Sequence, residues 1–84
     1  MQGPKPEIRE FIINNFLFGE GGEALKDDES FLDSGIIDST GVLELVGFLE
    51  ERFRIEVDAN ELVPENLDSV ERVSAFVQRK LNGG

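Results

Sequence analysis

A run of apolar residues between positions 35 and 53 constrains the fold of this chain more than any other stretch. The run follows a loop that ends in Asp38 and Ser39, and its apolar residues then recur every three or four positions. These residues are Val42, Leu45, Val46, Leu49 and Phe53. Their spacing predicts the buried face of an amphipathic helix of about four turns. The rest of the chain must supply the surface that covers this face.

A second stripe of the same predicted helix is mostly polar and contains one large aromatic residue. It consists of Thr40, Glu44, Gly47, Phe48 and Glu51. Because helical periodicity places this stripe away from the core face, we expect it to contact a partner protein. Glu50 is a further acidic residue that we expect to take part in that contact.

The flanking segments predict an all-α fold, a small bundle of three main helices plus one short helix, with a long first loop. The first helix has Pro6 in its first turn and ends before the glycine cluster at 19–22. The last helix is expected to begin at Asp68, which has capping-box spacing with Glu71. The apolar positions of these two helices are Ile8, Phe11, Ile12 and Phe16, and then Val70, Val73, Phe76, Val77 and Leu81.

The two connections of the predicted bundle contain short helical signals. In the first loop, 19–38, the capping-box spacing of Ser30 and Asp33 predicts a helical turn. Apolar residues are expected to hold this loop on the core, namely Leu25, Phe31, Leu32, Ile36 and Ile37. The second connection is expected to form a brief helix over 61–63, capped by Asp58 or Asn60 and stopped near Pro64.

The length and composition narrow the possible functions. Eighty-four residues suit one domain, 1–84, with the ends 1–6 and 82–84 expected to be mobile. The chain has no cysteine, so it cannot form a disulfide framework. It also has no histidine, and without these two residue types it lacks the side chains that most often act as general base or nucleophile at neutral pH. We therefore assign no catalytic residue. An EF-hand loop that started at Asp27 or Asp33 would place Leu32 or Asp38 where glycine is required, so no metal site is expected.

The charge of the chain is strongly acidic and unevenly distributed. The net charge is −10, and residues 20–65 alone carry −11. Such a surface repels nucleic acids and anionic membranes and favours basic protein partners. The sequence contains no signal peptide and no apolar run long enough to span a membrane, so we expect the protein to be cytoplasmic. We also expect it to be a monomer.

Ser39 is predicted to stand where the loop becomes the central helix. A serine there either caps the helix or, if another residue is the cap, leaves its hydroxyl free in the positive end of the helix dipole. Asp38 can be that cap. Two further Asp-Ser pairs end at Ser34 and Ser69, but only Ser39 is followed by a first turn without acidic residues, which suits a phosphate.

The segment GIIDSTGVLELVGFLEERF, residues 35–53, resembles the modification segment of the acyl carrier protein family. The resemblance extends from about Pro6 to Leu81, with Thr40 standing where the family motif usually has leucine. It implies that a phosphopantetheinyl transferase attaches 4′-phosphopantetheine to Ser39 as a phosphodiester, and that Asp38 helps to position the transferase and its metal-bound coenzyme A. The terminal thiol of the arm would then hold cargo as a thioester.

This resemblance implies a stand-alone acyl or aminoacyl carrier, not an enzyme, in lipid or secondary-metabolite biosynthesis. Its partners would be a transferase and an adenylating ligase or synthase with a basic docking patch. The segment 32–39 is somewhat more similar to carriers served by adenylating ligases, such as the D-alanyl carriers, than to the fatty-acid carrier. The alternative is an unmodified acidic helical adaptor that binds a basic partner through the same stripe.

Overall fold

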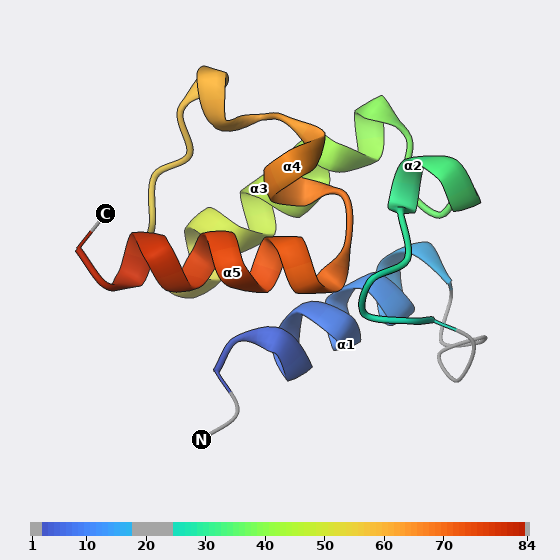
Figure 1. The fold of residues 1–84 in the computed structure, drawn as a ribbon, viewed down its shortest axis with the longest axis horizontal. Helices are drawn as coiled ribbons and strands as arrows, with labels where there is room; N and C mark the ends of the chain where they lie inside the picture. The colour runs from blue at the N-terminus through green and yellow to red at the C-terminus, as the bar shows by residue number, and fades with distance from the viewer. Residues whose placement is uncertain (1–2, 18–24, 84) are drawn as a thin grey trace.

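The computed structural model describes residues 3–17 and 25–83, and the regular structure in these residues is helical (Figure 1). The three long helices are α1 (Lys5–Phe16), α3 (Ser39–Phe53) and α5 (Val70–Leu81). The short elements are α2 (Phe31–Ser34), α4 (Pro64–Leu67) and the 3-10 turn η1 (Ala59–Glu61). The all-α prediction is confirmed, although the described residues form two short α-helices where one was expected.

The last helix is central to the packing. Figure 1 shows α5 crossing the molecule between α1 on one side and α3 and α4 on the other, and α5 contacts all three. Its predicted apolar face is buried at Val70, Val73, Phe76 and Val77, whereas Leu81 at the end of the helix is half exposed. Ile8 and Ile12 of α1 and Leu45 and Leu49 of α3 complete the centre of the core.

The first helix begins earlier than the sequence suggests. Pro4 is the N-cap residue and is buried, and Lys5 and Pro6 already lie in α1. The helix therefore includes the last two residues of the segment 1–6 that was expected to be mobile. Proline is favoured in a first helical turn because the N–H it lacks would have no partner within the helix. The glycine cluster at 19–22, which was expected to end this helix, lies outside the described residues.

The loop before α3 is held by three buried side chains, Leu25, Phe31 and Ile37, with Ile36 half-buried. The predicted turn is α2, and Ser30 caps it by accepting a hydrogen bond from the Asp33 N–H at 3.1 Å. The expectation that Leu32 also packs on the core is wrong, because its side chain is 47% exposed. A single helical turn can direct only one side of itself toward the core, and Phe31 occupies that side.

Asp68 does not cap the last helix as predicted. Ser69 does so, accepting from the Arg72 N–H at 3.0 Å. The Asp68 carboxylate instead accepts hydrogen bonds from the Ser30 hydroxyl and, at 3.0 Å, from the Leu32 N–H. The Phe31 N–H also donates to the Asp68 carbonyl at 2.8 Å. Asp68 thereby joins the start of α2 to the junction between α4 and α5.

The connection after α3 differs from the prediction in the position of its turn, which is η1 at Ala59–Glu61 and not a helix over 61–63, and in the role of Pro64. Asp58 is the N-cap of η1, as expected, but Pro64 begins α4 rather than stopping a helix. The fixed φ of proline suits the first residue of a helix as well as it suits a break, so the sequence alone leaves both roles open.

Candidate functional site

Ser39 is the first residue of α3, and Asp38 is the cap of this helix. The Asp38 Oδ1 accepts a hydrogen bond from the Gly41 N–H at 2.8 Å, and the Asp38 carbonyl accepts the Val42 N–H at 3.0 Å. The Ser39 side chain is exposed and makes no hydrogen bond to the described residues. The capping role that would have occupied the Ser39 hydroxyl is therefore filled by its neighbour.

The electrostatic surroundings of Ser39 favour an attached anion. The first turn of α3 contains no acidic residue, and its leading N–H groups point out of the helix with the positive end of the helix dipole. A phosphodiester on Ser39 would meet these N–H groups. Gly41 completes the turn, and it is buried against α1, where an added Cβ would lie 2.9 Å from both Phe16 and Ile37. The glycine thus serves helix packing, not the approach of a partner.

The other two Asp-Ser pairs do not offer a comparable hydroxyl. Ser34 is the last residue of α2, and its hydroxyl donates to the Phe31 carbonyl at 3.3 Å. Ser69 is 3% exposed, and its oxygen is the cap of α5. Of the three, Ser39 alone combines exposure, a hydroxyl with no hydrogen-bond partner among the described residues and the start of a long helix.

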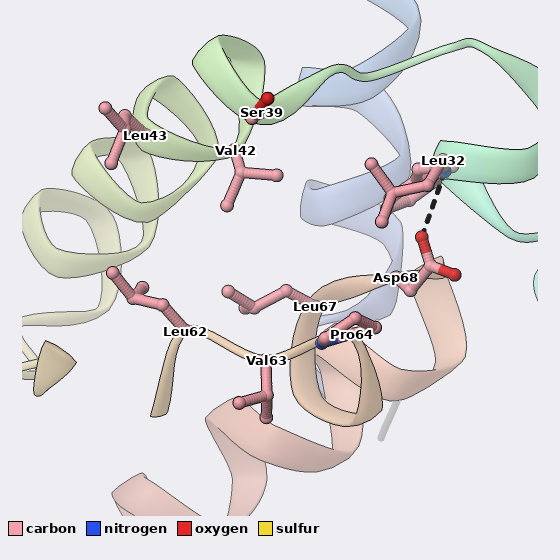
Figure 2. A pocket seen from close by; sticks show the side chains of 10 residues that line it. Leu32, Ser39, Val42, Leu43, Leu62, Val63, Pro64, Leu67 and Asp68 are labelled. Carbon is pink, nitrogen blue, oxygen red and sulfur yellow. Dashed lines mark hydrogen bonds between the residues drawn. The ribbon is translucent and has the colours of Figure 1, made fainter. Parts of the chain in front are cut away.

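An apolar groove of about 310 Å³ opens beside Ser39. Figure 2 shows Ser39, Val42 and Leu43 of α3 on one side of it and Leu62, Val63, Pro64 and Leu67 on the other, with Leu32 and Asp68 at one end. The described residues include five large apolar side chains that are exposed, and four of them line this groove, namely Leu32, Leu43, Leu62 and Val63. Exposed apolar surface concentrated at one place typically marks a binding site.

Polar contacts attach the η1–α4 side of the groove to α5. The Lys80 Nζ donates to both carboxylate oxygens of Glu61, at 3.0 and 3.3 Å. The Arg79 guanidinium donates to the Asn66 side-chain oxygen at 3.0 Å. These contacts fix the segment that faces Ser39 without using the apolar side chains that line the groove.

The Glu61 carboxylate is expected to make the stability of this segment pH-dependent. Its pKa is lowered first by the hydrogen bond from the Asp58 N–H and then by Lys80. A lowered folded-state pKa contributes stability above the ordinary glutamate pKa of about 4.3, and this contribution is lost as the pH falls through the folded value. Glu61→Gln should therefore lower the urea midpoint at pH 7, and the difference from wild type should shrink at a pH below the ordinary glutamate pKa. An equal difference at both pH values would contradict the assignment.

The residues predicted for partner binding divide into two groups. Thr40, Glu44, Gly47 and Glu51 are exposed on one side of α3, and Phe48 is half-buried beside them. Glu50 lies apart from them, because its carboxylate accepts the Val57 N–H at 3.0 Å and so holds the segment that follows α3. The structure thus keeps the predicted stripe together and gives Glu50 an internal contact.

The chain matches the family model described as "Phosphopantetheine attachment site" over residues 17–77, a range that includes Ser39. The chain belongs to the acyl carrier protein family. Members of this family carry 4′-phosphopantetheine covalently, and the exposed hydroxyl of Ser39, followed by a first turn without acidic residues, fits that group. Membership of a carrier family also disfavours the alternative of an unmodified adaptor.

Individual family members resemble the chain over most of its length. A D-alanyl carrier protein from Streptococcus uberis is 35% identical over 77 residues, covering 89% of this chain and 96% of the relative. The probable acyl carrier protein PigG from a Serratia species is 31% identical over 68 residues, covering 81% and 77%. The solution structure of a holo acyl carrier protein from Nitrosomonas europaea superposes with a TM-score of 0.79 at 25% identity and covers 98% of this chain and 99% of that one.

Three features of this carrier's site were missed by reasoning from the sequence. They are the apolar groove, the role of Asp68 in joining α2 to α5, and the contribution of α1 to the surface beside the partner stripe. The three exposed leucines and the exposed Val63 of the groove resemble core residues in sequence. Nothing local to Asp68 indicates that the partners of its carboxylate lie at 30 and 32. Phe11 was assigned to the core, although it is only half-buried.

Proposed function

We propose that Ser39 carries the 4′-phosphopantetheine arm and that this carrier holds acyl or aminoacyl cargo as a thioester on it. The observation that supports the proposal most directly is the exposed, unbonded Ser39 hydroxyl at the start of a 15-residue helix whose cap is provided by Asp38. The position of Ser39 beside the apolar groove gives the arm a surface on which to lie.

The attachment step uses the Ser39 oxygen as nucleophile. The bond from Ser39 Oγ to phosphorus forms, the diphosphate P–O bond of coenzyme A breaks, and adenosine 3′,5′-bisphosphate leaves. We assign the base that accepts the serine proton to the phosphopantetheinyl transferase, because this chain contains no histidine. Asp38 is exposed, and its second oxygen would help to position the transferase and its metal-bound coenzyme A.

We infer that the cargo is an aminoacyl group loaded by an adenylating ligase. The relatives named D-alanyl carrier proteins support this, together with the segment 32–39. We further propose that the protein has no catalytic activity of its own and works in the cytoplasm, where coenzyme A and ATP are available. Among the described helices, none is both long and apolar enough to cross a bilayer.

Intact mass tests this function in two stages. Incubation with coenzyme A, magnesium and a broad-specificity phosphopantetheinyl transferase should add the mass of one phosphopantetheine. Addition of ATP with D-alanine and a D-alanine-adenylating ligase should then add one alanyl group that hydroxylamine removes, whereas a fatty acid with an acyl ligase should add little. A carrier that accepts only the fatty acid would refute the aminoacyl assignment and leave the attachment intact.

A further inference from the structure

Asp68 is the one ionisable side chain among the described residues that line the apolar groove beside Ser39. The other lining side chains, apart from that of Ser39, are apolar, so the carboxylate stands at the end of an otherwise apolar surface (Figure 2). Asp68 is half-buried. In a pocket that is mostly apolar, the few polar groups typically orient the ligand and give the pocket its specificity.

The contacts of Asp68 within the protein hold its carboxylate in place but do not neutralise its charge. Oδ2 accepts a hydrogen bond from the Ser30 hydroxyl, and Oδ1 accepts one from the Leu32 N–H at 3.0 Å. Both donors are neutral groups. The ion pairs formed by the described residues involve other carboxylates, and none of them involves Asp68. An ionised carboxylate has about four lone-pair sites, so Asp68 also retains capacity to accept a further hydrogen bond.

The joining of α2 to α5 does not by itself require a charge at position 68. The oxygen of an asparagine would also accept from the Leu32 N–H, and its amide N–H could donate to the Ser30 oxygen. A carboxylate that is partly withdrawn from water without a cation beside it costs more free energy than a neutral amide. The carboxylate is better explained by a cationic ligand that approaches from the groove.

An aminoacyl cargo brings such a cation to this groove. Ser39 lines the same groove, so a flexible arm attached there can fold back across the apolar lining and bring its end to Asp68. An α-amino group ordinarily has a pKa of about 7.7–8.0, so below neutral pH it is mainly an ammonium. A fatty acyl chain in the same place would cover the carboxylate with hydrocarbon and leave its charge unpaired, which is unfavourable.

We propose that Asp68 recognises the α-ammonium of an aminoacyl cargo in the groove beside Ser39. The ion pair favours a small aminoacyl group over an alkyl group of the same size, while the apolar lining accommodates the arm. Asp68 acts only by binding and takes no part in making or breaking a bond. The inference deepens the proposed function and rests on it in placing the arm on Ser39.

The test compares two stable arms that differ only in the group to be recognised. One arm ends in a D-alanyl amide and the other in an isobutyryl amide, in which a methyl group replaces the ammonium. The transferase attaches each arm to the isotope-labelled protein from the corresponding coenzyme A analogue, and NMR spectra are recorded below neutral pH. Nuclear Overhauser effects from the arm to Leu32 and Val63 should be roughly threefold stronger for the alanyl arm, as expected for an ion pair that is partly exposed to solvent.

Asp68→Asn is the decisive variant, and Glu65→Gln is its matched control. Glu65 is exposed on α4 and does not line the groove, so its replacement removes the same charge from outside the groove. Asp68→Asn should reduce the contacts of the alanyl arm to the level of the isobutyryl arm, whereas Glu65→Gln should leave them unchanged.

Ser30→Ala separates the charge of Asp68 from its structural role. It removes one hydrogen bond to Asp68 and the cap of α2, but it keeps the carboxylate. Ser30→Ala should therefore lower the melting temperature and still retain the preference for the alanyl arm. If Ser30→Ala lost this preference to the same extent as Asp68→Asn, the effect would be structural and recognition by Asp68 would be refuted.

Two further results would overturn recognition by Asp68. They are equal contacts of the two arms in the wild-type protein and a preference for the alanyl arm that survives in Asp68→Asn. If the transferase attached neither arm, the attachment to Ser39 would be refuted instead. The two groups would then be presented as free pantetheine amides at millimolar concentration, and the same preference in the same variants would test Asp68 without Ser39.

Discussion

Ser39→Ala is expected to abolish the addition of phosphopantetheine completely while leaving the helical fold intact. The alanine removes the oxygen through which we propose that the phosphodiester forms. It removes no hydrogen bond to the described residues, since Asp38 is the cap of α3 and its bond to Gly41 remains. Intact mass after incubation with coenzyme A and the transferase measures the first effect, and thermal unfolding measures the second, with a change of free energy within about 0.5 kcal/mol.

The other Asp-Ser pairs provide the controls for this result. Ser34→Ala removes one exposed hydroxyl with a long hydrogen bond, so it should be modified like wild type. Ser69→Ala should also be modified, but it loses the cap of α5 and should cost about 1 kcal/mol of stability. Continued gain of mass by Ser39→Ala, or loss of it in Ser34→Ala, would show that the attachment site has been misassigned.

Phe31→Ala is expected to cost the fold about 3–5 kcal/mol, as is typical when a buried phenylalanine is truncated. Phe31 is 1% exposed and is the principal contact between α2 and the core. The loss is a large part of the 5–15 kcal/mol that stabilises an ordinary domain, so the variant should be partly unfolded at physiological temperature. Urea unfolding followed by circular dichroism measures the difference.

The adjacent Leu32→Ala is the matched control for this experiment. Leu32 is 47% exposed, and its contact with Asp68 uses the backbone N–H, which alanine retains. We expect a change of less than about 1 kcal/mol. Comparable losses in the two variants would mean that α2 is not held by the single buried ring and that the burial of Phe31 contributes little.

The periodic parts of the fold were predictable because they depend on neighbours three or four residues apart. The face containing Leu45, Val46 and Leu49 is buried as expected, and so is most of the apolar face of α5. The capping role of Asp38 was also predictable, since the bond spans three residues, from Asp38 to Gly41. The sequence motif around Ser39 then identified the family that the comparisons with known proteins confirm.

The parts that were mispredicted depend on residues far apart in the sequence. Asp68 has the local pattern of a helix cap, yet its carboxylate bonds to Ser30, 38 positions earlier, and Ser69 takes the cap. Leu32 is apolar like a core residue, but the single turn of α2 directs Phe31 toward the core and leaves Leu32 exposed at the groove. The neighbouring sequence does not distinguish Asp68 from an ordinary helix cap or Leu32 from an ordinary core residue.

The sequence by itself therefore determined the three long helices, the acidic surface and the choice of Ser39 as the proposed attachment residue, because each follows from local spacing or from composition. Only the tertiary structure decided that Leu43 and Leu62 line a groove beside Ser39 and that Phe11 stacks on Phe48 beside Gly47. Those surfaces arise where two helices meet, and the angle and offset of that meeting are set by side-chain packing across the whole core.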